Sequence, residues 1–297
     1  MSDIALERPR IRVVRVERPP LQLGGGAVHL VVVLISLVWL TPTVGLLVSS
    51  FRPPEMVSRT GWWTALTPPF AFTLENYERV LAAYNLWPSF LNSLIVTIPA
   101  TVIPLLIAAF AAYAFAWMEF PGRTALFLLV VGLLVVPLQM TLIPVLRLYT
   151  DLGLAGTFPG IWLAHSGYGL PFAVYLLRNF IGALPREMME AAYIDGASPM
   201  TVFFYLVLPT SVPALASLAI FQFVWVWNDL LVALIYLGGS PDVAPMTVTV
   251  SNLVNSLGQD WQLLTAAAFI SMVLPLAVFF SLQQYFVRGI LAGSVKG

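Results

Sequence analysis

Three carboxylates beside small residues, within positions 184–199, are the side chains of this sequence with the clearest chemistry. Pro185 is suited to open a helix there, because its missing N–H and its fixed φ fit the first turn. Glu187 and Glu190 then fall near the positive N-terminal end of that helix, which stabilises negative charge. The two alanines after Glu190 leave room for another surface to approach closely. The pattern predicts a short helix that binds a partner through acidic and apolar groups.

A second helical piece follows a predicted turn in the same segment. Gly196 permits a positive φ, which such a turn requires and most residues disfavour. Ser198 is an expected N-cap, and Pro199 is an expected first helical residue. A plain connector between two helices would also explain these residues. Helix–helix links usually take about 2–8 residues, however, and the stretch 178–202 is several times longer.

Polar and aromatic residues inside apolar runs form a second group of candidates. An aspartate at mid-helix costs about 2.5–3.5 kcal/mol on insertion scales, so Asp229, near the outer end of a run, invites a functional interpretation. It could line a solute path together with neighbouring tryptophan rings, or hydrogen-bond a neighbouring helix; both interpretations stay open. The candidate pathway residues are Trp225, Trp227, Asn228, Asp229 and Gln139. Weaker candidates, more typical of helix–helix hydrogen bonds, are His165, Asn179, Gln222 and Gln283.

Most kinds of catalytic site are excluded by residue counts. The chain has no cysteine and only two histidines, His29 and His165, which lie far apart in the sequence. Disulfides, thiolate chemistry and a histidine-based metal cluster are therefore not expected. The single lysine, Lys296, is followed only by Gly297, so the sequence contains no phosphate-binding P-loop. We expect a non-catalytic chain with no cofactor, metal or ATP site of its own.

The elements that must position these residues follow from an extreme composition. Of the 297 residues, 59% are hydrophobic and 9% are charged, and the mean hydropathy is +0.89. An average soluble protein has about 25% charged residues, and a soluble fold could not bury this much apolar surface. The formal net charge is zero, so nucleic acid is not an expected partner. The predicted fold class is an all-α polytopic membrane protein.

Six runs without charged residues are each long enough for a membrane-crossing helix, which needs about 20 residues. Helices satisfy their own backbone in lipid, and prolines within them are tolerated where neighbouring helices compensate. The first run is too long for a signal peptide and is expected to remain as an anchor. The six predicted spans are Ala27–Ser50, Leu91–Met118, Thr124–Leu146, Phe158–Leu177, Phe203–Asn228 and Trp261–Val287, and the prolines inside them are Pro42, Pro104, Pro137, Pro171, Pro213 and Pro275.

The basic residues set the orientation, because cytoplasmic loops carry an excess of arginine and lysine. A cytoplasmic N-terminus places most of the 14 basic residues inside and leaves outside only Arg52, Arg59, Arg79 and Arg147. Both termini are then cytoplasmic. The predicted parts are a tail at 1–26, a six-span domain at 27–287 that includes a cytoplasmic loop at 184–202, and a tail at 288–297. Long external loops are expected at 51–90 and 238–260.

The loop motif E-A-A-x-x-D-G-A, followed by L-P, resembles the signature loop of ABC-importer transmembrane subunits. Here it consists of Glu190-Ala191-Ala192, Asp195-Gly196-Ala197 and Leu208-Pro209. Further matching stretches are Asn92-Ser93, Ala112-Tyr113-Ala114-Phe115 and residues 285–297. They resemble the carbohydrate-import permeases of the maltose/maltodextrin type, specifically the shorter six-span subunit, and within that family the α-glucoside permeases. The resemblance covers essentially the whole chain after the N-terminal tail.

This resemblance implies a division of labour among subunits. The implied fold is the transmembrane domain of a type I ABC importer. Two different permeases would form the pathway as a heterodimer. Two cytoplasmic ATPase subunits would bind ATP and magnesium, and an extracytoplasmic binding protein would deliver the sugar. Closure of the ATPase would move the loop as a rigid body and tilt the spans, which gives alternating access.

The resemblance also implies roles for particular residues. The loop would be a coupling helix seated in a cleft of the ATPase, where Glu190 would pair with a basic residue. The external stretch Gly238–Asp260 would enter the sugar site of the binding protein. The implied coupling residues are Glu187, Glu190, Ala191, Ala192, Asp195, Gly196 and Ala197, and the C-terminal residues expected to reach the ATPase are Gly293, Ser294 and Lys296.

Other functions remain as alternatives. An ion-driven secondary transporter predicts broken helices, an inverted repeat and intramembrane carboxylates, and the spans offer only the boundary residue Asp229. An importer for a polyol or a sugar phosphate would keep the same fold with another cargo. An intramembrane enzyme would need a nucleophile–base pair or a metal set, which the histidine and cysteine counts disfavour.

Overall fold

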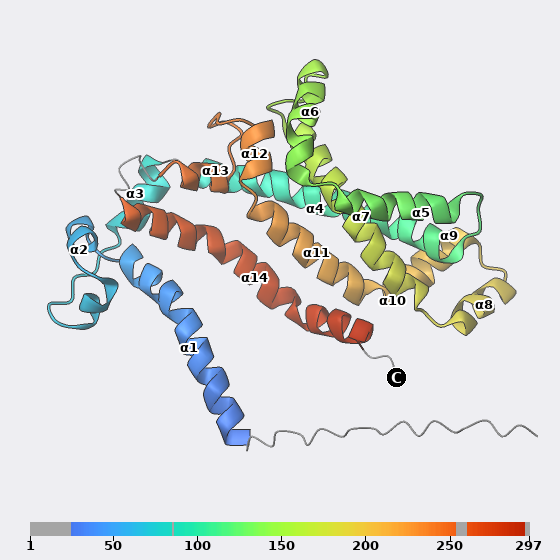
Figure 1. The fold of residues 1–297 in the computed structure, drawn as a ribbon, viewed down its shortest axis with the longest axis horizontal. Helices are drawn as coiled ribbons and strands as arrows, with labels where there is room; N and C mark the ends of the chain where they lie inside the picture. The colour runs from blue at the N-terminus through green and yellow to red at the C-terminus, as the bar shows by residue number, and fades with distance from the viewer. Residues whose placement is uncertain (1–24, 85, 254–259, 295–297) are drawn as a thin grey trace, which may run out of the picture. The chain divides into compact units, whose positions relative to one another are not determined.

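Helices form the regular structure in the part of the chain that the computed structural model describes, residues 25–84, 86–253 and 260–294 (Figure 1). Contacts divide the chain into two units, Met1–Gly45 and Leu46–Gly297, and the described part of the first unit belongs to α1. The α-helices are α1 Gly25–Ser50, α2 Pro54–Arg59, α3 Glu75–Ala83, α4 Leu86–Trp117, α5 Arg123–Gly132, α6 Leu138–Asp151, α7 Phe158–Gly182, α8 Arg186–Ile194, α9 Pro199–Val202, α10 Leu208–Thr210, α11 Val212–Trp227, α12 Leu231–Tyr236, α13 Met246–Ser251 and α14 Trp261–Ser294. The 3-10 helices η1 and η2 span Trp62–Leu66 and Leu133–Val135, and the π-helix η3 spans Phe203–Val207.

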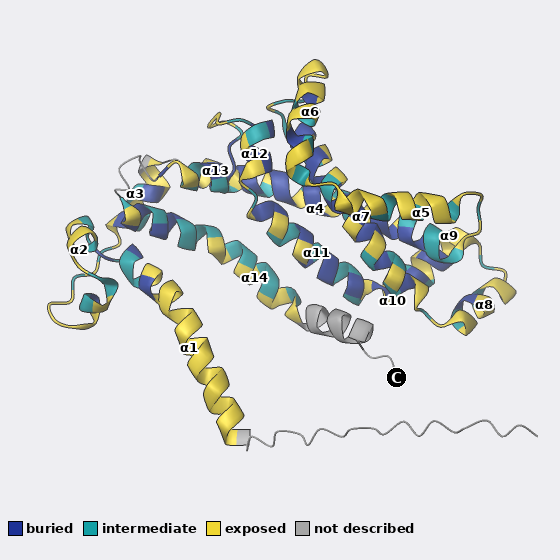
Figure 2. Cartoon of the chain, in the orientation of Figure 1, coloured by how far each residue is buried: buried dark blue, intermediate teal, exposed yellow. Residues whose placement is uncertain are grey.

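Helices α4, α7 and α11 form the packed centre of the second unit (Figure 1). The most extensive contact joins α4 to α7, while α11 lies against both of them and against α14. Ala100, Ala108 and Ala112 of α4 and Ala173 of α7 are buried. Small residues let membrane helices approach closely, and this packing replaces the hydrophobic force that lipid cannot supply. Figure 2 shows the buried residues gathered on these helices, whereas α5 and α6 are largely exposed.

Each predicted span has a helical counterpart. Stretches of α1, α4 and α14 are single helices long and apolar enough to cross a membrane, and two bent helix pairs raise the number to as many as five. The fourth predicted span is α7, a continuous helix of 25 residues. Pro42, Pro104, Pro171 and Pro275 lie inside helices, as expected. The all-α polytopic fold is therefore confirmed.

The third predicted span is not one straight helix, and the prediction was wrong in its geometry. Helices α5 and α6 meet at 102°. The break lies at Val136, whose backbone is extended (φ −72°, ψ 115°), directly before Pro137. Proline disfavours a helical conformation in the preceding residue and has no N–H to continue the ladder. Pro137 therefore ends a helix instead of lying inside one.

The fifth predicted span is broken as well. The piece from α9 to α10 meets α11 at 71°. Ser211 lies at the break (φ −90°, ψ 1°), and Pro213 occupies the first turn of α11 instead of a helix interior. Within the first piece, η3 is a π-helix, a form that is frequent at functional sites. The bend separates the end of the 184–202 loop from the apolar helix α11.

A buried arginine organises the segment after α1, which the sequence predicts to be external. Arg52 is 1% exposed, and its guanidinium donates to the carbonyl oxygens of Met56 and Thr60 and to two threonine hydroxyls. The amide of Asn76 donates to the carbonyl of Arg52 and so ties α3 to the segment. Burial lowers the pKa of Arg52, yet an arginine stays protonated in proteins. The acceptors replace the water that this cation has lost.

Replacing Arg52 by methionine is expected to destabilise the segment 53–75 by about 1–3 kcal/mol, because its carbonyl and hydroxyl acceptors lose the guanidinium donor. Limited proteolysis of the membrane-reconstituted protein measures this as faster cleavage within the segment. Arg59→Met is the matched control, since Arg59 ends α2 and is exposed. Equal cleavage rates in the two variants would contradict the role of Arg52.

Candidate functional site

Helix α8 and the turn after it lie at one end of the second unit, and α12 and α13 lie toward the other end (Figure 1). Pro185 precedes the helix at the N-cap, one residue before the position predicted for it. Gly196 has φ +78°, as the predicted turn requires. The Ser198 hydroxyl accepts a hydrogen bond from the N–H of Thr201 at 3.2 Å, which confirms the predicted N-cap. The sequence thus predicts the local structure of this loop correctly.

The loop is held firmly to the helical core. The Tyr113 hydroxyl of α4 lies 3.2 Å from the Tyr193 hydroxyl of α8 and donates to the carbonyl of Pro199 at 3.1 Å. Met189 is buried in the same cluster as Leu177 of α7. One residue of α4 therefore contacts both halves of the helix–turn–helix, and α8 and α9 are fastened to two long helices.

The outer face of α8 is acidic and exposed. Glu187, Ala191 and Asp195 are exposed, and Ala192 and Ala197 are half-buried. The Glu190 side chain is 66% exposed, and its Oε1 lies 3.8 Å from Nε of Arg186, whose side chain is still more exposed. Such a surface pair contributes about 0–1 kcal/mol, so it does not bind the carboxylate tightly. The face offers a carboxylate and small residues to an approaching surface.

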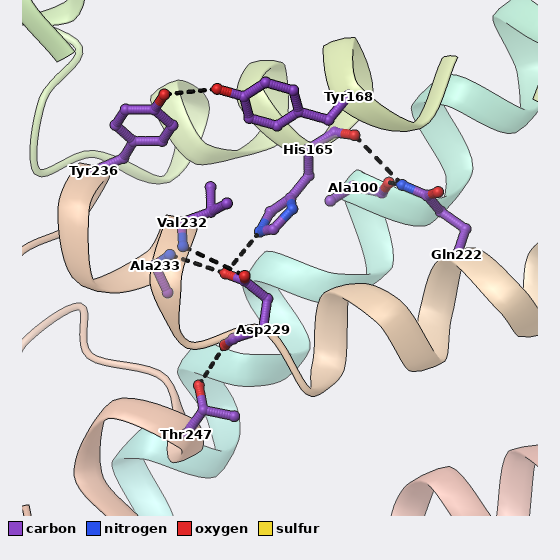
Figure 3. A network of polar contacts seen from close by, with 9 residues as sticks. All are labelled: Ala100, His165, Tyr168, Gln222, Asp229, Val232, Ala233, Tyr236 and Thr247. Atoms are coloured by element: carbon purple, nitrogen blue, oxygen red, sulfur yellow. Dashed lines mark hydrogen bonds and ion pairs between the residues drawn. The ribbon is translucent and has the colours of Figure 1, made fainter. Parts of the chain in front are cut away.

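A network of polar contacts joins α4, α7, α11 and α12 inside the second unit (Figure 3). The Asp229 carboxylate accepts hydrogen bonds from the N–H groups of Val232 and Ala233, so it caps the start of α12. Its Oδ2 lies 3.7 Å from Nε2 of His165, which is 0% exposed. In the described part of the chain, neither ring nitrogen of His165 has a hydrogen-bond partner. A buried polar group left in this state costs about 1–3 kcal/mol.

Gln222 connects three helices at the centre of this network. Its Nε2 donates to the carbonyl of Ala100 in α4 at 3.1 Å and to that of His165 in α7 at 3.4 Å. Gly169 of α7 makes room for this side chain, because a Cβ at that position would lie 2.5 Å from Gln222 Oε1. Gln222 is therefore a helix–helix hydrogen-bonding residue, as the sequence suggested for it.

An aromatic hollow of about 260 Å³ opens beside this network, between α7 and α11. Trp225 lines it and is 37% exposed, and its ring meets the His165 ring edge-on at 5.3 Å. Phe172 and Phe221 add two further rings, both partly exposed. Gln222 and Tyr168 bring an amide and a phenol to the same lining. Rings flanked by a few polar groups suit a ligand that is apolar on one face and polar at its edge.

The other predicted pathway residues are not brought together with Trp225. Trp227 is 2% exposed, stacks with Phe223, and donates its Nε1–H to the carbonyl of Ser271, so its ring is a packing element. Asn228 lines a separate hollow of about 340 Å³ and donates to the carbonyl of Val224. Gln139 is exposed on α6. Of the five candidates, only Trp225 lines the aromatic hollow.

Some predicted residues lie outside the described structure. Lys296 is not described, and Gly293 and Ser294 lie in the part of α14 whose side chains are not described. Part of the predicted external stretch, residues 254–259, is likewise outside the described residues. Its described part contains α13, where the Thr247 hydroxyl donates to the carbonyl of Asp229.

Several site residues escaped the sequence-based prediction. Phe172, Phe221 and Tyr168 were not among the candidates, because their exposure to a common hollow depends on how α7 crosses α11. The helical spacing of Phe221 and Trp225 was a signal that both lie on one face of α11. The role of Tyr113 in holding α8 had no local signal, because its two partners lie 80 and 86 residues further along the chain.

Comparison with known families decides where the chain belongs. Residues 29–292 match the family described as binding-protein-dependent transport system inner membrane component. The chain belongs to this family. The resemblance to importer permeases carried by the E-A-A loop is thereby confirmed, and with it a role as a membrane-spanning transport subunit.

Two relatives and one solved structure place the permease more closely. It is 62% identical over 272 residues to the osmoprotective compounds uptake permease protein GgtD of Synechocystis, with 91% of each chain covered. It is 45% identical to the alpha-glucoside transport system permease protein AglG of Rhizobium meliloti, over 91% of this chain and 97% of that protein. A bacterial ABC transporter involved in the import of the acidic polysaccharide alginate has a TM-score of 0.72 at 20% identity, over 88% of this chain and 95% of that chain. This last likeness shows the fold, that of a type I importer transmembrane domain.

Proposed function

We propose that this permease is one of two membrane subunits of an ATP-driven, binding-protein-dependent importer for a small sugar, an α-glucoside or a related osmoprotective glucoside. The observation that carries the proposal is the exposed acidic face of α8, which Tyr113 and Met189 fasten to the helical core. Because α8 is held in this way, a displacement of α8 by a cytoplasmic subunit is transmitted to the membrane-spanning helices. The similarity to one osmoprotectant and one α-glucoside permease supports the class of cargo.

The energy for transport comes from another chain in this proposal. The sequence contains no P-loop, so ATP and magnesium are bound by two partner ATPases. The coupling surface consists of Glu187, Glu190, Ala191, Ala192, Asp195, Gly196 and Ala197, with Glu190 pairing with a basic residue in an ATPase cleft. A different permease completes the pathway, and an extracytoplasmic binding protein delivers the sugar. A related fold has been solved as an alginate importer in complex with its pentasaccharide-bound periplasmic protein.

The permease has a defined orientation in the membrane in this proposal. Both termini lie in the cytoplasm of a bacterial or archaeal cell, on the same side as α8. The C-terminal residues Gly293, Ser294 and Lys296 then reach the ATPase. The stretch 238–260 faces the binding protein on the opposite side. The excess of arginines in the cytoplasmic segments supports this orientation.

Purification of the chain from its native membrane in mild detergent tests the proposed function. An ATPase and a second permease are expected to co-purify, and the assembly should take up maltose, sucrose or trehalose into liposomes only with ATP and the binding protein. A chain that purifies alone and still moves solute along an ion gradient would overturn the proposal in favour of a secondary transporter.

The sugar contact of this subunit is proposed at the aromatic hollow. Pyranose rings have an apolar face that packs on aromatic rings, and hydroxyl groups at the edge that need hydrogen-bond partners. Trp225, Phe172 and Phe221 supply the rings, and the Gln222 amide lies at the hollow's lining. Asp229 is not part of this contact, because its carboxylate already caps α12.

Trp225→Ala is expected to raise the KM of sugar uptake about tenfold, the factor that corresponds to roughly 1.4 kcal/mol of lost contact. The maximal rate should change less, because the replaced ring does not touch the α8 surface. Uptake into proteoliposomes of the complete assembly gives both constants. Phe280→Ala removes a more exposed aromatic ring from α14, away from the hollow, and should leave KM unchanged. An unchanged KM in Trp225→Ala would exclude the hollow from the sugar path.

A further inference from the structure

His165 is the most anomalous buried side chain in the described part of the permease. It has no exposed surface, and both ring nitrogens lack hydrogen-bond partners. Native proteins satisfy nearly all buried polar groups, so a histidine kept in this state calls for an explanation. The polar group that faces it is the Asp229 carboxylate, 3.7 Å from Nε2 (Figure 3).

Asp229 is one of several points at which the α12–α13 segment is attached to the core, and α4 also bonds to this segment through Asn92 and Ser93. The Asp229 carboxylate holds the first turn of α12 through Val232 and Ala233. Its carbonyl accepts the hydroxyl of Thr247, which belongs to α13. A force on Asp229 therefore acts on α12 and α13 together. This is the segment that faces the binding protein in the proposed function.

His165 lies on the helix that leads to the coupling surface. Helix α7 runs without a break from Phe158 to Gly182, and α8 begins at Arg186. A displacement of α7 along its axis reaches both His165 and α8. The pair of His165 and Asp229 therefore lies between α7 and a residue that holds α12 and α13, and the same helices are also joined by the 2.7 Å hydrogen bond between the hydroxyls of Tyr168 and Tyr236.

The observed separation suits a contact that forms and breaks. A distance of 3.7 Å is too long for a hydrogen bond, whose usual N–H···O length is about 2.9 Å. A shift of about 0.8 Å would form a charge-assisted bond from the imidazole N–H to the carboxylate. Helices at interfaces commonly move about 1–2 Å in conformational transitions, so the shift is within ordinary range. Asp229 keeps its backbone donors in either state.

We propose that His165 and Asp229 form a latch between α7 and the α12–α13 segment, open in this structure and closed by a hydrogen bond in another conformation of the transport cycle. The latch rests on the proposed function. Both residues are positioning residues. They contact no sugar, and they link occupancy of the face toward the binding protein to the position of α7 and hence of α8.

The number of sugars transported per ATP hydrolysed tests the latch, because a purely structural role would lower transport and hydrolysis together. His165→Phe keeps an aromatic ring against Trp225 and removes both nitrogens. It should lower this ratio about fivefold or more, the lower end of coupling between distinct sites. Asp229→Asn should lower it similarly, and the double variant should be no worse than the worse single variant, because the two side chains act through each other. The KM for sugar should stay within twofold.

Two further variants make the test decisive. His165→Gln keeps an N–H donor at a similar reach and should restore at least half of the ratio. Ser166→Ala removes the neighbouring buried hydroxyl of α7 and should leave the ratio unchanged. The latch is overturned if His165→Phe keeps the wild-type ratio, if the two single effects multiply in the double variant, or if Ser166→Ala lowers the ratio equally. A wild-type assembly without sugar-stimulated ATPase activity would instead overturn the proposed function.

Discussion

Replacing Gly196 by proline is expected to lower sugar uptake about 100-fold while the chain still inserts into the membrane. Gly196 has φ +78°, whereas proline fixes φ near −65°. The substitution also removes the N–H that bonds to the carbonyl of Tyr193 at 3.0 Å. A misplaced proline costs about 3 kcal/mol or more, which corresponds to roughly two orders of magnitude. The turn would open, and the acidic face of α8 would lose its orientation toward a partner.

The measurement pairs ATP-dependent uptake in proteoliposomes with the ATPase activity of the same assembly. Uptake is expected to collapse, and hydrolysis should no longer respond to the sugar-loaded binding protein. Gly182→Ala is the matched control, because Gly182 ends α7 and a Cβ there meets only Ala116 Cβ at 3.9 Å. Normal uptake by Gly196→Pro would refute the assignment of this loop as the coupling surface.

Gly169→Leu is expected to lower sugar uptake by a similar factor, because it disrupts the packing of α7 against α11. Even a Cβ at Gly169 would lie 2.5 Å from Gln222 Oε1. The larger side chain must displace the Gln222 amide of α11, which donates to the carbonyls of Ala100 in α4 and His165 in α7. Leaving those groups unpaired costs about 1–3 kcal/mol each, and overpacking adds about 1–3 kcal/mol. The leucine would also fill the aromatic hollow.

Uptake by Gly169→Leu is expected to fall about 100-fold, with a lower thermal stability of the purified assembly. Gly167→Leu provides the comparison, since nothing lies within 4 Å of a Cβ at that position in the same helix. It should retain most of the uptake. If the two leucine variants lowered uptake equally, the close crossing of α7 and α11 at Gln222 would not be required for transport.

Local chemistry made several features predictable from the sequence. The positive φ of Gly196 and the N-cap at Ser198 depend on neighbours within three residues, so the residue types suffice to infer them. The helical nature of the spans follows from the lack of water in the bilayer core, which forces each apolar run to satisfy its own backbone. Family membership rested on the spacing of the E-A-A loop, and the family match confirms it.

Other predictions failed because they depended on backbone geometry at single residues. The sequence predicts Pro137 and Pro213 inside spans. In the structure Pro137 lies at the 102° break between α5 and α6, and Pro213 lies in the first turn of α11, after the 71° break. An apolar run has the same composition whether it is straight or bent. Whether a proline kinks, ends or begins a helix depends on what the freed backbone groups meet in the fold.

The candidate pathway residues also differ in what the sequence could predict and what only the fold determines. Trp225 and Trp227 are two residues apart on one helix and equally good sugar ligands by type. The crossing of α7 and α11 leaves Trp225 at a hollow, while α14 covers Trp227 and accepts its N–H. For Asp229 the sequence left a ligand role and a structural role open, and the structure shows its carboxylate accepting hydrogen bonds from two backbone N–H groups at the start of α12.

The sequence by itself determined that this chain is an all-helical membrane protein, that it has no P-loop, and that it carries a structured acidic loop of the importer type. These properties depend on composition and short-range spacing, so they can be inferred before the fold is known. Only the tertiary structure decided which tryptophan faces a hollow, which tyrosine holds α8, and that His165 and Asp229 face each other across 3.7 Å. Such facts arise where helices cross, and the crossings are set by the packing of residues far apart in the chain.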